Sequence, residues 1–488
     1  MRIRQKLGAG TRINATASVL GVATAFAKTY LVARWVPAGD VGGYALALVA
    51  IGLAALVGGL GLSASLYHHH RVSARMFDRL LALPLGAGLA AGALSGGVLY
   101  AVSELPGVTL GITVGCVAVA AGGQAFANLA ATRLQLALEF RRAGVCALAA
   151  RVAADALVVA CIARSPDLLG LLLGLAGAGA VTALVYAVGA FPAALRRFGY
   201  AGRLEDAPAE QDPPLGVLLR LGSVSVLHGA TNFAVFRLDR VIVGYAYGLG
   251  LLGQYELILQ LVERPAQLIA QSTRGVVAPL MARYQARASA VRRVYAWHVR
   301  TGMIAAAPYY VGLAAFAPLV LGVLFDAPEE GLRWVVVAAC ALTLTKVTGA
   351  PFYHYAVARG RLTLMLYVEA AVALLRVGVL LGLALVSSIA WAYGVYVTVR
   401  ILLAFAFEQT LRSRWLRLGA GPAFAPAARG LLAAAAAAGL AAICLRLAPE
   451  TIGSAFALAL VVVVSATSYL ALMRPLLLAL LRDTPAAR

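Results

Sequence analysis

Residues 41–66 read VGGYALALVAIGLAALVGGLGLSASL, a run that contains no charged side chain. The hydrocarbon core of a bilayer is ~30 Å thick, and an α-helix of ~20 apolar residues crosses it. This stretch is therefore long enough to span a membrane. Comparable apolar runs recur from one end of the chain to the other. The pattern predicts a chain that crosses the membrane many times, with no large soluble domain.

Composition supports the same class of protein. Hydrophobic residues make up 62% of the 488 residues and charged residues 12%, and the mean hydropathy is +0.87. A soluble protein carries roughly 25% charged residues because its surface faces water. The composition therefore excludes a soluble multidomain protein and indicates an all-α integral membrane protein.

About fourteen transmembrane helices are predicted from the apolar runs. We expect a six-helix bundle at 1–200, a cytoplasmic linker at 201–214, a second six-helix bundle at 215–415 and two additional helices at 416–488. The expected spans are 15–36, 41–66, 80–102, 109–134, 144–163, 168–194, 216–246, 250–280, 296–325, 331–357, 362–386, 388–411, 424–447 and 453–481.

The connections between these spans alternate in arginine content, which sets the orientation of the chain. Connections such as 103–108 (SELPGV) and 326–330 (DAPEE) lack arginine, whereas the alternate ones carry it, as at Arg141 and Arg142. The basic start runs into the first span without a small-residue cleavage site, so it is expected to be retained. Both termini are therefore predicted to be cytoplasmic.

The formal net charge of +21 is spread over short connections between apolar spans. A nucleic-acid-binding protein would gather its charge in one basic patch, so nucleic acid is not an expected partner. The five cysteines are scattered and contain no CxxC pair. They indicate neither a metal site nor a disulfide framework, and no cofactor is expected.

A weak internal repeat emerges when the chain is shifted by 211 residues. The shift places Gly42 on Gly253 and Tyr44 on Tyr255, among other matches. Both copies lie at the turn from one span to the next, and both halves begin on the cytoplasmic side. The halves are therefore predicted to be parallel repeats related by an axis along the membrane normal.

The two matched turns also carry a family resemblance. Residues 30–66 (YLVARWVPAGDVGGYALALVAIGLAALVGGLGLSASL) and 236–284 (FRLDRVIVGYAYGLGLLGQYELILQLVERPAQLIAQSTRGVVAPLMARY) resemble the starts of the two halves of polysaccharide-type flippases. These belong to the multidrug/oligosaccharidyl-lipid/polysaccharide exporter superfamily. The resemblance implies a bacterial inner-membrane protein that moves an undecaprenyl-pyrophosphate-linked oligosaccharide by alternating access. Membrane lipid, polysaccharide polymerase and glycosyltransferases are the further partners that it implies.

Charges within the predicted spans suggest where such a substrate would bind. A charge at mid-bilayer costs ~2.5–3.5 kcal/mol on insertion scales, so each one calls for a reason. In the family, the first and seventh spans face a central cavity, and surplus cations there would hold a pyrophosphate by charge-assisted hydrogen bonds. Carboxylates among them would carry a coupling proton or sodium ion. The candidate cations are Lys28, Arg237, Arg240, Arg264, Lys346 and Arg376, and the candidate carboxylates are Asp239, Glu256 and Glu263.

Plainer interpretations stand beside these assignments. Arg151 and Asp155 lie four residues apart and are expected to form a structural ion pair. Arg133 is expected to lie at a cytoplasmic helix end with its charge reaching toward water. Prolines within spans, among them Pro265 and Pro308, are either bending points for alternating access or static kinks.

Two other function classes remain as alternatives. A multidrug antiporter of the same superfamily would export cations, which a cavity rich in arginine and lysine would repel. A membrane polymerase or ligase of oligosaccharides would resemble its relatives in carrying a large periplasmic loop with catalytic residues. The short predicted periplasmic connections argue against such an enzyme.

Overall fold

The computed structural model describes the chain in helices that confirm the all-α class; the part described contains no strand. The described residues are 20–21, 23–68, 74–103, 105, 107–136, 139–190, 213–284, 288–358, 367, 370–371, 374–375, 377–379, 381–382, 388–411, 421–447 and 453–482.

Helix ends lie close to the predicted span limits, because apolar length sets both. The expected span 109–134 is observed at Leu110–Leu136, and 453–481 at Ser454–Arg482. A helical segment at 23–35 precedes the following helices: α2 (Ala38–Gly58), α3 (Leu62–His68), α4 (Ala74–Val102), α5 (Leu110–Leu136), α6 (Phe140–Arg164), α7 (Leu168–Ala190), α9 (Leu215–Tyr284), α10 (Ala288–Ala315), α11 (Ala317–Leu324), α12 (Leu332–Ala358), α14 (Ile389–Leu411), α15 (Gly421–Leu447) and α16 (Ser454–Arg482).

Within the described residues, eight helical stretches are long and apolar enough to cross a bilayer. A ninth is the pair formed by α10 and α11, which is bent by 74°. The sequence predicted one span at 296–325, where the structure has this broken pair. The expected span 362–386 lies mostly outside the described residues, so the total of fourteen stays a prediction. The chain is a multi-pass membrane protein.

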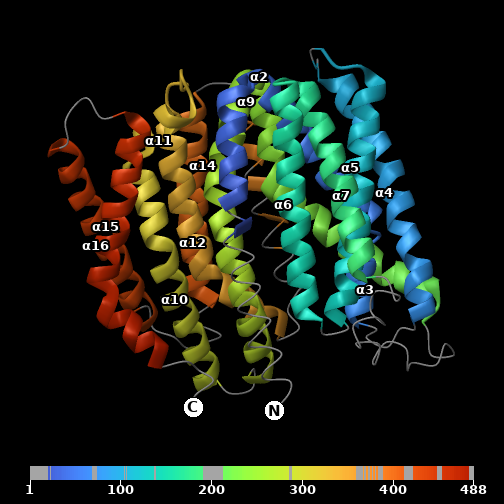
Figure 1. Ribbon diagram of the computed structural model, residues 1–488. Coiled ribbons are helices and arrows are strands. Elements are labelled where there is room, and N and C mark those ends of the chain that lie inside the picture. The colour runs from blue at the N-terminus through green and yellow to red at the C-terminus, as the bar shows by residue number, and fades with distance from the viewer. Residues whose placement is uncertain are drawn as a thin grey trace. The chain divides into compact units, whose positions relative to one another are not determined.

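The chain separates into two compact units, Met1–Leu257 and Ile258–Arg488. In the first unit, α2 contacts α4, α5 and α7, while α5 and α6 each pack against α7, as the blue-to-green helices of Figure 1 show. Buried apolar side chains, including Leu66, Phe77 and Leu129, form a core at one end of this unit. The predicted boundary at 201–214 lies almost wholly outside the described residues, so the proposed bundle limits remain a prediction.

The second unit is organised around α10. This helix packs against α12 and α15, and α15 packs against α16, as the yellow and red helices of Figure 1 show. Ile304 and Ala307 of α10 share a buried cluster with Ala434 and Ala437 of α15 and with Tyr469 of α16. The two C-terminal helices are therefore joined to α10 through small residues that permit close approach.

The helix α9 is two arms joined at Gly248. That residue has φ 86° and ψ 167°, a conformation that glycine adopts without the steric cost of a Cβ atom. The break falls between the predicted spans 216–246 and 250–280. The first arm lies against α2, because a Cβ at Gly52 would be 2.8 Å from Phe233 and one at Gly229 would be 2.5 Å from Leu56.

The predicted repeat is visible as a reciprocal backbone contact within the first unit. A Cβ added at Gly42 would overlap the carbonyl oxygen of Leu249, and one added at Gly253 would overlap that of Ala38. The 211-residue shift maps Ala38 onto Leu249 and Gly42 onto Gly253. The shift therefore converts the contact of Gly42 with Leu249 into the contact of Gly253 with Ala38, as a two-fold relation between the repeats requires.

This contact predicts that alanine is destabilising at two of four matched glycines and tolerated at the other two. Gly42→Ala and Gly253→Ala should each lower the free energy of unfolding by about 1–3 kcal/mol, because a methyl group would displace backbone. The control variants are Gly39→Ala and Gly250→Ala, which are related by the same shift and have nothing within 4 Å of the added Cβ. Thermal unfolding of the purified variants measures the difference. Equal midpoints for all four variants would show that the contact is looser than described.

Candidate functional site

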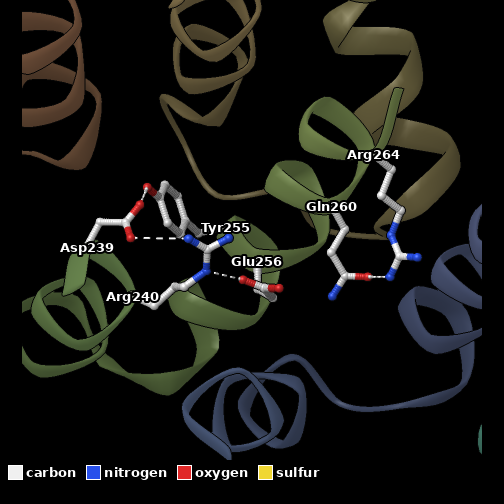
Figure 2. Close-up of polar contacts among 6 residues, drawn as sticks. All are labelled: Asp239, Arg240, Tyr255, Glu256, Gln260 and Arg264. Carbon is white, nitrogen blue, oxygen red and sulfur yellow. Dashed lines mark hydrogen bonds and ion pairs between the residues drawn. The ribbon is translucent and has the colours of Figure 1, made fainter. Parts of the chain in front are cut away.

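A group of buried polar side chains surrounds the break in α9. Asp239 and Arg240 lie on the first arm, and Tyr255 and Glu256 lie just after the break, on the second. Because the chain reverses at Gly248, residues sixteen positions apart come into contact. Figure 2 shows the Arg240 guanidinium directed toward Glu256 and the Asp239 carboxylate directed toward Tyr255.

The Arg240 side chain lies between two carboxylates. Its Nε donates to Oε2 of Glu256 at 2.7 Å, and its Nη1 donates to Oδ1 of Asp239 at 3.2 Å. The hydroxyl of Tyr255 donates to the other oxygen of Asp239, Oδ2, at 2.7 Å. These contacts occupy both oxygens of Asp239 and two nitrogens of the guanidinium.

All four side chains are removed from solvent, and none is more than 1% exposed as a residue. A buried ion is tolerated when partners with good geometry offset its desolvation. Asp239 and Glu256 offset the charge of Arg240 from two sides.

A second buried ion pair joins the first helical segment to α6. The Nζ of Lys28 lies 2.7 Å from Oδ1 of Asp155, and the hydroxyl of Thr24 donates to Oδ2 at 3.2 Å. Arg151, the partner expected for Asp155, lies one turn earlier on α6, with its Cδ 3.0 Å from the Cβ position of Gly21. The Lys28 contact was not predicted, because the two residues are far apart in sequence.

The repeat shift relates the two groups position by position. Lys28 corresponds to Asp239, Thr29 to Arg240, Tyr44 to Tyr255 and Ala45 to Glu256. All eight residues are buried. Since threonine and alanine replace arginine and glutamate, the first repeat has a single lysine where the second has a three-residue ion cluster. The site is therefore geometrically repeated and electrostatically different in its two copies.

The other predicted site residues are placed as follows. Arg237 is half-buried on the first arm of α9. In the second unit, Arg264 donates to Gln260 at 3.1 Å, as Figure 2 also shows. Glu263 and Lys346 are half-buried, and Arg376 lies outside the described residues. The assignment of these residues to substrate or ion binding stays a prediction.

Several functional-site contacts were missed at the level of sequence. Tyr255 was recognised as a repeat position, but its hydroxyl was not recognised as a partner of Asp239. Arg133 was expected to reach water, whereas its side chain is 3% exposed and pairs with Asp78. Its guanidinium also lies over the ring of Phe77, 5.4 Å from the centroid. The acidic Asp78 near the start of α4 was the available signal.

In the described part of the chain, no three histidine, cysteine, aspartate or glutamate side chains are grouped as a metal site. The five cysteines are free thiols, and three of them are buried.

Comparison with known proteins identifies the type of fold. A sequence profile of the family described as "Polysaccharide biosynthesis protein" matches residues 31–328. The structure is similar to the lipid II flippase MurJ in an inward closed conformation, with a TM-score of 0.69, 10% identity and coverage of 96% of this chain and 99% of that one. It is also similar to an inward-facing multidrug resistance MATE family transporter of the MOP superfamily, with a TM-score of 0.57, 14% identity and coverage of 81% and 99%. No curated protein matches the sequence.

The buried cluster predicts that Glu256→Gln destabilises the protein. Removing the charge of Glu256 leaves Arg240 with less compensation, and breaking a buried ion pair costs ~3 kcal/mol or more. Thermal unfolding in detergent and abundance in membranes measure the loss. In the triple variant Asp239→Asn, Arg240→Met and Glu256→Leu, all three charges are removed together, so part of the stability should return. A Glu256→Gln protein as stable as the wild type would contradict the ion-pair account.

Proposed function

The chain belongs to the polysaccharide biosynthesis protein family, and from this membership we propose that it is a flippase for undecaprenyl-pyrophosphate-linked oligosaccharides. It would move these repeat units from the cytoplasmic to the periplasmic leaflet of a bacterial inner membrane, for synthesis of a surface polysaccharide. The family match over residues 31–328 carries the proposal. The similarity of fold to a lipid II flippase over 96% of the chain supports it.

The reciprocal glycine contact gives this proposal a mechanical element. With both termini cytoplasmic, the turns that hold Gly42 and Gly253 lie at the periplasmic side. Their backbones are in direct contact, and we propose that this contact belongs to a state closed toward the periplasm. Release of a substrate to the periplasm requires the two turns to separate, which is the movement that alternating access demands.

Lys28 is the cation best suited to receive the pyrophosphate. Its ammonium group lies 2.7 Å from the carboxylate of Asp155, which a diphosphate of higher charge would displace. Arg240 is held by two carboxylates and would contribute once those contacts rearrange. Arg237, Arg264, Lys346 and Arg376 are proposed as the further cations along the substrate path.

Ion coupling is assigned to the carboxylates of the α9 break. Asp239 and Glu256 both contact one guanidinium, so uptake of a proton or sodium ion by either carboxylate would change how Arg240 is held. Glu263, seven residues or about two helical turns beyond Glu256, is proposed as a third member. Binding of the ion would loosen the hold on Arg240 and make that cation available to phosphate.

A multidrug antiporter is the second candidate, favoured by the similarity to a MATE transporter. The two functions differ in the sign of the cargo. An antiporter for cationic drugs would use the carboxylates near Gly248 to bind its substrate directly. The reported structural neighbours are flippases and transporters, and the polymerase or ligase alternative has no observation in its favour.

A charge swap at Lys28 and Asp155 separates binding from stability. Lys28→Asp alone should abolish polysaccharide export and lower protein abundance, because two carboxylates would face each other. The double variant Lys28→Asp with Asp155→Lys restores the ion pair, so abundance should return. Export should not return, because the cation is then on α6. Export is measured in cells that lack the native gene.

The matched control is Lys28→Arg, which keeps a cation on the first helix and should retain part of the export. If the swapped variant exports as well as the wild type, Lys28 is a structural residue only, and its assignment to the pyrophosphate fails. If export of polysaccharide is unaffected by loss of the whole protein while cationic dyes accumulate in cells, the antiporter is the correct function.

A further inference from the structure

Two prolines in the second unit leave backbone carbonyls without their usual partners. Pro265 lies within α9 and Pro308 within α10. Proline has no N–H, so the carbonyl four residues earlier cannot accept its helical hydrogen bond. The carbonyls concerned are those of Leu261 and Ile304. In a membrane an unsatisfied carbonyl is costly, and a neighbouring side chain must supply the missing donor.

Tyrosine hydroxyls from adjacent helices supply both donors. Tyr309 of α10 donates to the carbonyl oxygen of Leu261 at 2.9 Å. Tyr469 of α16 donates to that of Ile304 at 2.8 Å. Each hydroxyl therefore reaches the one carbonyl that a proline has released, although most of the carbonyls in both helices already accept a helical bond.

A third bond reinforces the first. Tyr310 donates to the carbonyl oxygen of Val262 at 2.9 Å, next to the carbonyl that Pro265 releases. The rings of Tyr309 and Tyr310 meet edge to face with centroids 5.1 Å apart. Tyr310 is fully buried and Tyr469 is 4% exposed, and their bonds to Val262 and Ile304 are buried. The bond from Tyr309 to Leu261 is partly buried.

The two prolines are also linked to each other through the tyrosines. Tyr309 and Tyr310 directly follow Pro308 in sequence, so a change of bend at Pro308 moves the hydroxyls that reach α9. The carbonyl that Pro308 releases is in turn bound by Tyr469, whose ring packs in the buried cluster shared by α10, α15 and α16. A continuous set of contacts therefore runs from α16 through α10 to α9.

We propose that these tyrosines are latches that hold two proline hinges, and that the C-terminal helix pair thereby sets the bend of α10 and α9. Each latch keeps its helix in the bend of this conformation and opens when the hinge moves. The two helices after the second bundle then have a mechanical role in transport. The arrangement depends on the hinges alone and not on the chemistry of the transported substrate.

Double-mutant cycles test the pairing of each hydroxyl with its proline. The variants are Tyr309→Phe, Pro265→Ala and their combination, and Tyr469→Phe, Pro308→Ala and their combination. Hydrogen–deuterium exchange of the full-length protein in lipid nanodiscs is measured over peptides that cover 261–267 and 304–310. The matched control is Thr467→Val, since the Thr467 hydroxyl bonds only within α16, to Val463 and Val464.

Loss of a tyrosine hydroxyl should speed exchange across its own hinge by roughly threefold, the effect of an average side-chain hydrogen bond in a membrane protein. In the alanine background the helix regains its own N–H donor, so the same Tyr→Phe change should have no effect. Thr467→Val should leave both peptides unchanged. Equal effects of Tyr→Phe with and without the proline would overturn the pairing.

The hinge role is tested by export in cells. Pro265→Ala and Pro308→Ala should each reduce export at unchanged abundance, because a hinge that has regained its helical bond resists bending. If both alanine variants export as the wild type does, the tyrosines only satisfy static kinks and the latch proposal is overturned. Since the exchange measurement uses no substrate, its failure is distinct from a wrong assignment of the cargo.

Discussion

The burial of charge in an apolar environment is the constraint on which the rest of the structure depends. Arg240 is only 1% exposed, and its charge is tolerated because Asp239 and Glu256 hold it from two sides. To bring Glu256 to Arg240, the chain must reverse at Gly248. That reversal places Gly253 against Ala38 and Leu249 against Gly42. The ion cluster and the contact between the two repeats are thus consequences of one turn.

The two repeats compensate their buried charges in different ways. Positions equivalent to Arg240 and Glu256 are Thr29 and Ala45 in the first repeat, and both are buried. Without that ion pair, Lys28 takes its carboxylate from Asp155 on α6. One repeat therefore satisfies its charge locally, within α9, and the other satisfies it through a neighbouring helix.

Much of the fold could be predicted because apolar length determines where a helix crosses a membrane. The ends of α5 and α16 were predicted within two residues, and the break at Gly248 fell between two expected spans. The bend of 74° between α10 and α11 was missed, because the mainly apolar residues 296–325 were interpreted as one span, although Pro318 lies beside the break, in the first turn of α11.

Prediction of the site succeeded for positions and failed for partners. Lys28, Asp239, Arg240 and Glu256 could be selected because charges within apolar spans are costly. Their pairings depend on contacts between segments that are distant in sequence. Neutral partners such as Tyr255 gave no comparable signal, and the tyrosines that reach proline-released carbonyls become visible only in three dimensions.

Transport by the purified protein is the most direct measurement of the central claim. Proteoliposomes would carry a fluorescent polyprenyl-pyrophosphate-linked oligosaccharide in both leaflets, and a membrane-impermeant quencher would be added outside. The account predicts that quenching proceeds through the outer leaflet and continues to the inner leaflet only when the protein is present. The vesicles must be shown to contain folded protein, and they are supplied with either a proton or a sodium gradient. If quenching then stops at the outer leaflet, a lipid-linked oligosaccharide is not the cargo.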